Sequence, residues 1–179
     1  MKRMCKRKYI VEDKILNKED RTEELFEKGL TAFNEKNYDR AIEMWAICAR
    51  NDHINSIINL GKCHKNGWGV PRNNESAANF FSYAAILGDA GAQNTIGYYY
   101  TQGEGVPLDE KEAAYWFQKS AEQGHPTGMS NLGECYRDGY GDIEQDFAKA
   151  EYLFNKAIAA GEEGAKEELA KLKKIMTIP

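Results

Sequence analysis

The sequence is poor in the residues from which metal sites are built. Its 179 residues include three histidines and four cysteines, and no two cysteines form a Cys-x-x-Cys pair. The cysteines and histidines do not follow the spacing of a zinc site either, so we predict that the chain binds no metal and no cofactor. Cysteines that are few and unpaired favour a reducing compartment, and we therefore expect a cytoplasmic protein.

Long apolar runs are also missing. No stretch approaches the roughly 20 apolar residues that cross a membrane. The basic start MKRMCKRK is followed by YIVEDKILNKED, in which charges recur every few residues, whereas a secretory signal has an apolar segment at that place. We expect a soluble chain without a membrane span, whose residues 1–20 form a basic tail that is partly disordered or folds back.

Positive charge is scarce outside this tail. The first eight residues hold five of the 24 lysines and arginines, which leaves 19 basic residues against all 28 acidic ones in the remainder. Nucleic-acid binding needs a basic face that neutralises phosphates, so we do not expect the folded body to bind nucleic acid.

Motifs of nucleophilic catalysis are absent too. The sequence contains neither Ser-x-x-Lys nor Gly-x-Ser-x-Gly. His53 and His125 have no carboxylate and nucleophile at a spacing that would bring the three groups together. We therefore predict no catalytic residue and no enzyme.

What the sequence does contain is an internal repeat. The segments GWGV at 67–70, GEGV at 103–106 and GYGD at 139–142 follow one another at a step of 36 residues. Four other kinds of position keep this step to within one residue: a Leu-Gly or Ile-Gly pair (60–61, 96–97, 132–133), an alanine (Ala77, Ala113, Ala150), a phenylalanine (Phe81, Phe117, Phe154) and a closing glycine (Gly88, Gly124, Gly161). Self-similarity at this period is typical of stacked helical repeats.

Each unit has the pattern of two helices joined by the Gly-x-Gly loop. In residues 90–125, we expect Asp109 to cap the second helix and Gly124 to end it in the left-handed conformation. Gly97 lacks bulk, so the two helix backbones can approach each other there, with Phe117 in the remaining space. One such hairpin cannot bury its apolar faces alone, so the units should stack into an all-α solenoid of antiparallel helix pairs.

The loop itself allows a second interpretation, because a glycine-rich turn before a helix can hold a phosphate. Three copies at equal spacing instead favour a turn that every unit needs. We expect Val70 and Val106 to tuck the loop against its own hairpin. Trp68, between two loop glycines, either packs on the adjacent loop or anchors a partner, since tryptophan is favoured at such sites.

Residues 90–125 carry the pattern (Leu/Ile)-Gly-x-x-Tyr, Gly-x-Gly-Val and Trp-Phe-x-Lys-Ser-Ala-Glu-Gln-Gly, which resembles the Sel-one-like repeat, a relative of the tetratricopeptide repeat. Residues 25–49 lack the loop and look more like an ordinary tetratricopeptide unit. The resemblance implies a right-handed α-solenoid with the following parts: a tail at 1–20, a tetratricopeptide-like repeat at 21–53, Sel-one-like repeats at 54–89, 90–125 and 126–162, and a capping helix at 163–179.

Proteins that resemble this family usually act as adaptors or scaffolds. The resemblance implies a non-enzymatic module that binds a protein or peptide on a concave surface lined by the first helix of each pair. Helical spacing puts one stripe of side chains on that face, and such a stripe suits hydrogen bonding to an extended peptide. The predicted contact residues are Asn55, Lys62, Lys65, Asn94, Tyr98, Thr101, Ser130, Glu134, Arg137 and, on the loop, Trp68.

The first repeat has apolar residues on the same stripe, namely Phe26, Leu30 and Phe33. Soluble monomers avoid exposed apolar patches. We expect the segment YIVEDKIL, residues 9–16, to fold back over these side chains, or a partner to cover them.

Three consecutive tyrosines cannot face the same way on one helix. We expect Tyr100 in the core, Tyr99 against a neighbouring helix and Tyr98 in the groove. Cys63 and Cys135 occupy the position of Tyr99 in other repeats, and two helix-packing distances of about 10 Å separate them too far for a disulfide.

Two other functions stay open. Certain proteins that resemble these repeats are linked to hydrolase or β-lactam-binding activity, and the module could instead serve homodimerisation through an exposed terminal repeat. The sequence leaves the oligomeric state open, although a monomer is favoured.

Overall fold

The structure, a computed structural model, describes residues 18–177, and these form nine consecutive α-helices without any strand. Their bounds are α1 Lys18–Asn34, α2 Tyr38–Ala49, α3 Ile54–Asn66, α4 Asn74–Ile86, α5 Ala90–Gln102, α6 Glu110–Glu122, α7 Pro126–Asp138, α8 Phe147–Ala159 and α9 Ala165–Met176. Within these residues, no helix combines the length and the apolar character needed to cross a membrane. Residues 1–17, with the predicted YIVEDKIL segment, lie outside the described part of the chain.

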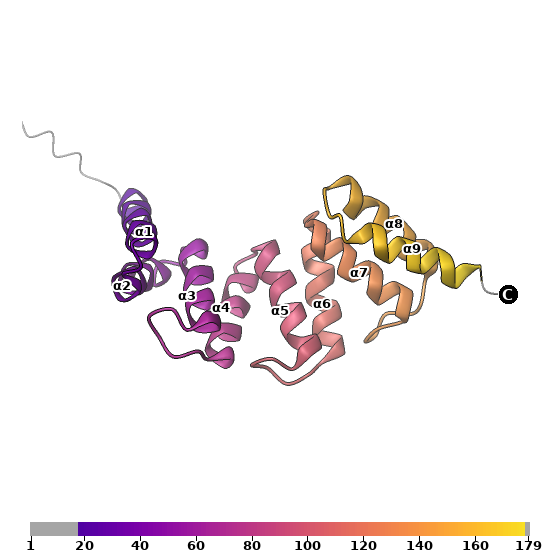
Figure 1. Cartoon of the computed structure of the whole chain (residues 1–179), viewed down its shortest axis with the longest axis horizontal. Helices are drawn as coiled ribbons and strands as arrows, with labels where there is room; N and C mark the ends of the chain where they lie inside the picture. Colours follow the sequence, from indigo (N-terminus) through magenta and orange to yellow (C-terminus); the bar gives the residue numbers. More distant parts are fainter. Residues whose placement is uncertain (1–17, 178–179) are drawn as a thin grey trace, which may run out of the picture.

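The helices follow one another in space as they do in the sequence, from α1 at one end of a bent row to α9 at the other (Figure 1). Each first helix packs on the second helix of its pair, and each pair packs on the next. The predicted all-α solenoid is confirmed.

The row bends toward the first helices of the pairs. α5 contacts α7 and α7 contacts α9 across the second helix between them, whereas the described second helices α4, α6 and α8 make no comparable contact with one another. In a curved row the elements on the inner side lie closer together. The first helices therefore line the concave side and the second helices the convex side.

Side-chain caps fix where the helices begin. The predicted cap is confirmed, because the Asp109 carboxylate accepts hydrogen bonds from the backbone N–H groups of Lys111 and Glu112. The first helices begin at caps that keep the same 36-residue step, with His53, Asp89 and His125 accepting a backbone N–H in the first turn of α3, α5 and α7. Gly124 has the expected positive φ of 77°.

A close approach of the two helices in each pair requires glycine. A Cβ on Gly97 would lie 2.7 Å from Cε1 of Phe117, and Gly133 faces Phe154 in the same way. The Phe117 ring lies where any side chain at position 97 would be, so the predicted role of this glycine is confirmed.

The core position among the three tyrosines is Tyr99, which is fully buried, whereas Tyr100 is only partly buried between two core clusters. The prediction that Tyr100 is the core tyrosine is wrong, whereas Tyr99 contacts a neighbouring helix as predicted, with its ring centroid 5.7 Å from that of Phe81 on α4. Cys63 and Cys135, at the same position in other repeats, are also buried and have free thiols. The position thus faces the core in three repeats, and only its occupant changes.

The Gly-x-Gly loops join neighbouring repeats. The second glycine of each loop has a positive φ and lies against the first residue of the preceding second helix: Gly69 on Tyr38, Gly105 on Asn74 and Gly141 on Glu110. The Asn74 side chain also donates a hydrogen bond of 2.9 Å to the carboxylate of Glu104, which stands between Gly103 and Gly105 in the loop of the following repeat. The loops therefore contact the preceding repeat as well as their own hairpin, and Val70 and Val106 pack on clusters that contain residues of both.

Trp68 is half-buried and packs on the first repeat. Its ring centroid lies 5.1 Å from that of Phe33 and 6.4 Å from that of Tyr38. Phe26 is buried and contacts the His53 ring, while Leu30 packs on the same core cluster. Residues of α2, α3 and the next loop thus cover much of the apolar stripe on α1. Whether residues 9–16 add to this cover, as predicted, lies outside the described part of the chain.

Candidate partner-binding groove

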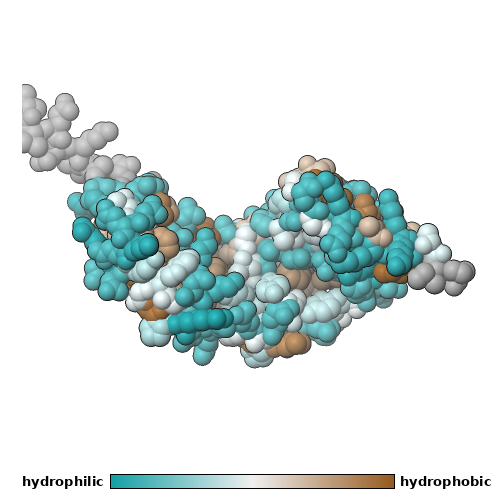
Figure 2. All heavy atoms as spheres, viewed as in Figure 1, coloured by the Kyte–Doolittle hydropathy of each residue, from teal (hydrophilic) through white to brown (hydrophobic). Residues whose placement is uncertain are grey.

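Two hollows separate successive first helices on the concave side. The one between α3 and α5, called here the α3–α5 hollow, has a volume of about 610 Å³. It is lined by Ile58, Lys62, Lys65, Asn66, Asp89, Asn94, Thr95 and His125, with Phe81 of α4 behind them. The α5–α7 hollow has a volume of about 480 Å³. It is lined by Tyr98, Thr101, Gln102, Asn131, Glu134, Asp138 and Tyr140, with Phe117 and Cys135 behind them. The space-filling view shows the arc as a mostly polar surface with scattered apolar side chains (Figure 2).

The hollows gather six of the predicted contact residues. Lys62, Lys65 and Asn94 line the first, and Tyr98, Thr101 and Glu134 line the second. Asn55 is exposed but lies in a separate hollow at the junction of the first two repeats, beside Glu23 and His53.

Residues that the sequence analysis missed lie on the flank of the predicted stripe. Asn131 donates a hydrogen bond of 2.8 Å to the side chain of Asn94, which links α7 to α5 across the groove. Gln102 and Asp138 follow the predicted positions by one residue, and Tyr140 comes from the loop. Helical spacing carries a signal for Asn131, because it stands one turn before Cys135, which lines the same hollow.

Ser130 does not reach the groove. Only 5% of its surface is exposed, so a partner cannot contact it without moving α7. This predicted contact is wrong.

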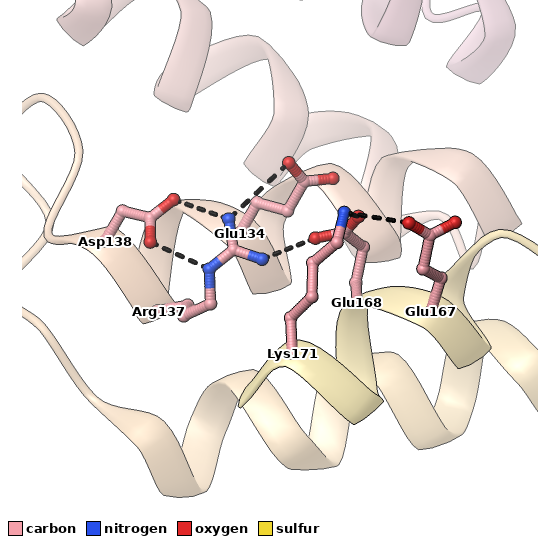
Figure 3. A network of polar contacts seen from close by, with 6 residues as sticks. All are labelled: Glu134, Arg137, Asp138, Glu167, Glu168 and Lys171. Carbon is pink, nitrogen blue, oxygen red and sulfur yellow. Dashed lines mark hydrogen bonds and ion pairs between the residues drawn. The ribbon is translucent and has the colours of Figure 1, made fainter. Parts of the chain in front are cut away.

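Arg137 is held by the last helix (Figure 3). Its guanidinium donates hydrogen bonds of 2.8 and 2.7 Å to the Asp138 carboxylate and a further one to Glu168 of α9. Lys171 of α9 donates to Glu168 at 2.8 Å. The Arg137 side chain is 13% exposed, so it fastens α9 to α7 and is not free to bind a partner as predicted.

The charges of this network shift two pKa values. The hydrogen bonds with Asp138 and Glu168 raise the pKa of Arg137, with Asp138 the larger cause. Burial alone would raise the pKa of Glu168, but the hydrogen bonds from Lys171 and Arg137 outweigh it and lower that pKa. Both groups are therefore held in their charged forms.

Glu134 stands apart from this pairing. Its Oε2 lies 3.9 Å from an Arg137 nitrogen that is already bonded to Asp138, and no described residue donates a hydrogen bond to it. Burial, followed by the nearby charge of Glu168, raises the pKa of Glu134. The α5–α7 hollow thus contains a carboxylate whose described ion pair is one long contact with a cation that it shares with Asp138 and Glu168.

The comparisons with known proteins agree with this architecture. The sequence pattern of the Sel1 repeat matches residues 54–89, 90–125 and 126–162. The chain belongs to the Sel1 repeat family. Sel1 repeats are generally protein-interaction modules of a non-catalytic, scaffold type.

Solved Sel1 structures share the fold. A Sel1 repeat protein from Oxalobacter formigenes is 25% identical over 80% of this chain and 59% of its own, with a TM-score of 0.74. A protective antigen of uropathogenic Escherichia coli is 27% identical over 84% of this chain and 33% of its own, with a TM-score of 0.77. This chain therefore spans less than two thirds of either relative. The cysteine rich protein B of Helicobacter pylori, 21% identical over 66% of this chain and 93% of its own, has a TM-score of 0.54 and shows the fold alone.

One cluster in this Sel1 repeat chain brings together the three kinds of group that form a catalytic triad. The Ser56 hydroxyl lies 2.8 Å from Nδ1 of His53, and Nε2 of His53 lies 3.4 Å from Glu23. The expectation that no base, carboxylate and nucleophile come together is thus wrong. Ser56, however, is completely buried, and Nδ1 also accepts the Ser56 backbone N–H. The cluster caps α3 and presents no hydroxyl that a substrate can reach.

The described thiols of this Sel1 chain are equally inaccessible. Burial raises the pKa of Cys63 to about 11 and that of Cys135, with a smaller contribution from Glu134, to about 12. A thiol with a raised pKa is a poor nucleophile at neutral pH. Within residues 18–177, no three potential ligands lie close enough together to hold a metal ion.

Proposed function

We propose that this Sel1 repeat chain is an adaptor that holds an extended segment of a partner protein along α3, α5 and α7. The observation that carries the proposal is the pair of adjoining hollows on the concave side, of about 610 and 480 Å³. Each has the size of a typical ligand pocket.

The side chains between the hollows suit a peptide. The Tyr98 side chain is 49% exposed on α5, and aromatic side chains with both an apolar ring and a polar tip are frequent anchors at interfaces. The amides of Asn94, Asn131 and Gln102 offer hydrogen-bond donors and acceptors to an extended backbone.

The test compares two triple variants with the wild-type chain in pull-downs from the native cell extract. The groove variant combines Lys62→Ala, Tyr98→Ala and Gln102→Ala, all of exposed residues. The matched control combines Ile86→Ala, Tyr115→Ala and Tyr152→Ala, which are exposed on the convex side. Circular dichroism and thermal melting establish that both are folded.

We expect proteins that are captured by the wild type and the control to be lost from the groove variant. Equal capture by the groove variant and the wild type would refute the proposal. So would turnover in a hydrolase screen that disappears on Ser56→Ala, because the chain would then be an enzyme.

A further inference from the structure

The two hollows differ in charge. Lys62 and Lys65 face the α3–α5 hollow, whereas Glu134 and Asp138 face the α5–α7 hollow. Because both hollows border α5, a segment bound along the groove crosses from one charge to the other.

The α3–α5 hollow has an excess of positive charge. None of the described ion pairs includes Lys62 or Lys65. Lys65 lies over the Tyr99 ring, 5.6 Å from its centroid. The carboxylate of Asp89 is engaged as a cap by the backbone N–H of Ala92 at 2.6 Å. Two ammonium groups therefore lack an anionic partner.

The α5–α7 hollow has an excess of negative charge. In the network of Figure 3, four carboxylates share two cations, Arg137 and Lys171, and both cations are already bonded to Glu168. Glu134 is left with one contact at 3.9 Å. The rings of Tyr98 and Tyr140 line the same hollow, and aromatic faces attract cations. A lysine or arginine side chain fits this combination of carboxylate and aromatic groups.

We infer, on the basis of the proposed function, that the groove selects an extended protein segment with one basic and one acidic side chain, the basic one in the α5–α7 hollow and the acidic one in the α3–α5 hollow. Successive first helices of a stacked array are about 10 Å apart, and an extended chain advances about 3.3 Å per residue. The centres of the two hollows are one such step apart, and their charged walls on α3 and α7 are two steps apart. The two charged residues are therefore about three to six positions apart.

The experiment selects binders from a random 12-residue peptide library displayed on phage, with the full chain as bait. The same selection uses Lys62→Glu/Lys65→Glu and Glu134→Gln as baits. Their matched controls are Lys156→Glu on α8 and Glu43→Gln on α2, both exposed and on the convex side. Dissociation constants are then measured for the enriched peptides.

Wild-type selections should enrich peptides with a basic and an acidic residue about three to six positions apart. Glu134→Gln should weaken these peptides about fivefold and end the preference for the basic residue, while Lys62→Glu/Lys65→Glu should end the preference for the acidic one. The two controls should behave as the wild type.

Two outcomes overturn the inference, and they differ in what else they refute. Peptides that lose binding on Tyr98→Ala but show no charge preference refute the charge-based selection and leave the proposed groove standing. Enriched peptides that bind equally well to Tyr98→Ala, or no enrichment at all, refute both the selection and the proposed function.

Discussion

The contact between repeats at the loop glycines can be tested by replacing one glycine with alanine, which adds a single methyl group. A Cβ on Gly105 would lie 2.2 Å from the carbonyl oxygen of Asn74, at the start of α4. Backbone atoms cannot move aside as a side chain can, so Gly105→Ala should force the third repeat away from the second. Gly124 supplies a matched control: its φ of 77° is close to the 75° of Gly105, but nothing lies within 4 Å of its Cβ position.

The two variants should differ by the energy of the clash alone. Alanine in the left-handed region costs about 1 kcal/mol at either position. Forcing extra volume into a packed contact adds roughly 1–3 kcal/mol, which only Gly105→Ala incurs. We therefore expect Gly124→Ala to lower the free energy of unfolding by about 1 kcal/mol and Gly105→Ala by roughly 2–4 kcal/mol.

Thermal melting followed by circular dichroism measures the difference. For a chain of this length each 1 kcal/mol corresponds to a fall in Tm of about 2–4 °C, so Gly105→Ala should melt several degrees below Gly124→Ala. Urea titration should also show a smaller m-value for Gly105→Ala if the repeats unfold separately. Equal Tm values for the two variants would refute the role assigned to the loop.

Three further predictions concern charge and the ends of the row. Glu168→Gln should lower the free energy of unfolding by about 1 kcal/mol at pH 7. Because the folded-state pKa of Glu168 is lowered, this difference between variant and wild type should vanish in urea titrations as the pH falls below the usual carboxyl pKa. A difference that persists in acid would contradict the assigned ion pair. Glu134→Gln should have the opposite sign, since the pKa of Glu134 is raised. The variant should be more stable than the wild type at pH 7, and the difference in the free energy of unfolding should close on acidification. A less stable variant at pH 7 would show that the 3.9 Å contact with Arg137 outweighs the burial of the charge. Trp68→Ala should lower the free energy of unfolding by about 2 kcal/mol, because the ring contacts with Phe33 and Tyr38 are lost. Amide hydrogen exchange should then show α1 and α2 opening first. Unchanged protection of these helices would show that Trp68 does not hold the first repeat.

Much of the fold could be predicted because its determinants are local and repeated. The cap at Asp109 and the close approach at Gly97 depend on residues within one helix pair, and the pattern presents them several times. The phase of a helix about its own axis is harder to predict: Tyr99 and Tyr100 differ by one position, both are large, and the packing of the neighbouring pair decides which of them is buried.

Part of the candidate site could be predicted because its determinants are also local. Lys62, Asn94 and Tyr98 line the hollows because helical spacing sets which face they share. Arg137 could not be assigned correctly, because its partner Glu168 lies 31 residues later in a helix outside the repeat pattern. The contact of His53 with Glu23 likewise joins the cap of α3 to α1, 30 residues earlier in the sequence, so helical spacing does not reveal it.

The measurement that tests the groove most directly is a nuclear magnetic resonance titration of the isotopically labelled chain with the tightest peptide from the library selection. Binding in the groove predicts that the amide signals of Lys62, Asn94, Tyr98 and Glu134 shift first, on α3, α5 and α7. Shifts confined to the convex helices α4, α6 and α8, around Ile86, Tyr115 and Tyr152, would contradict it.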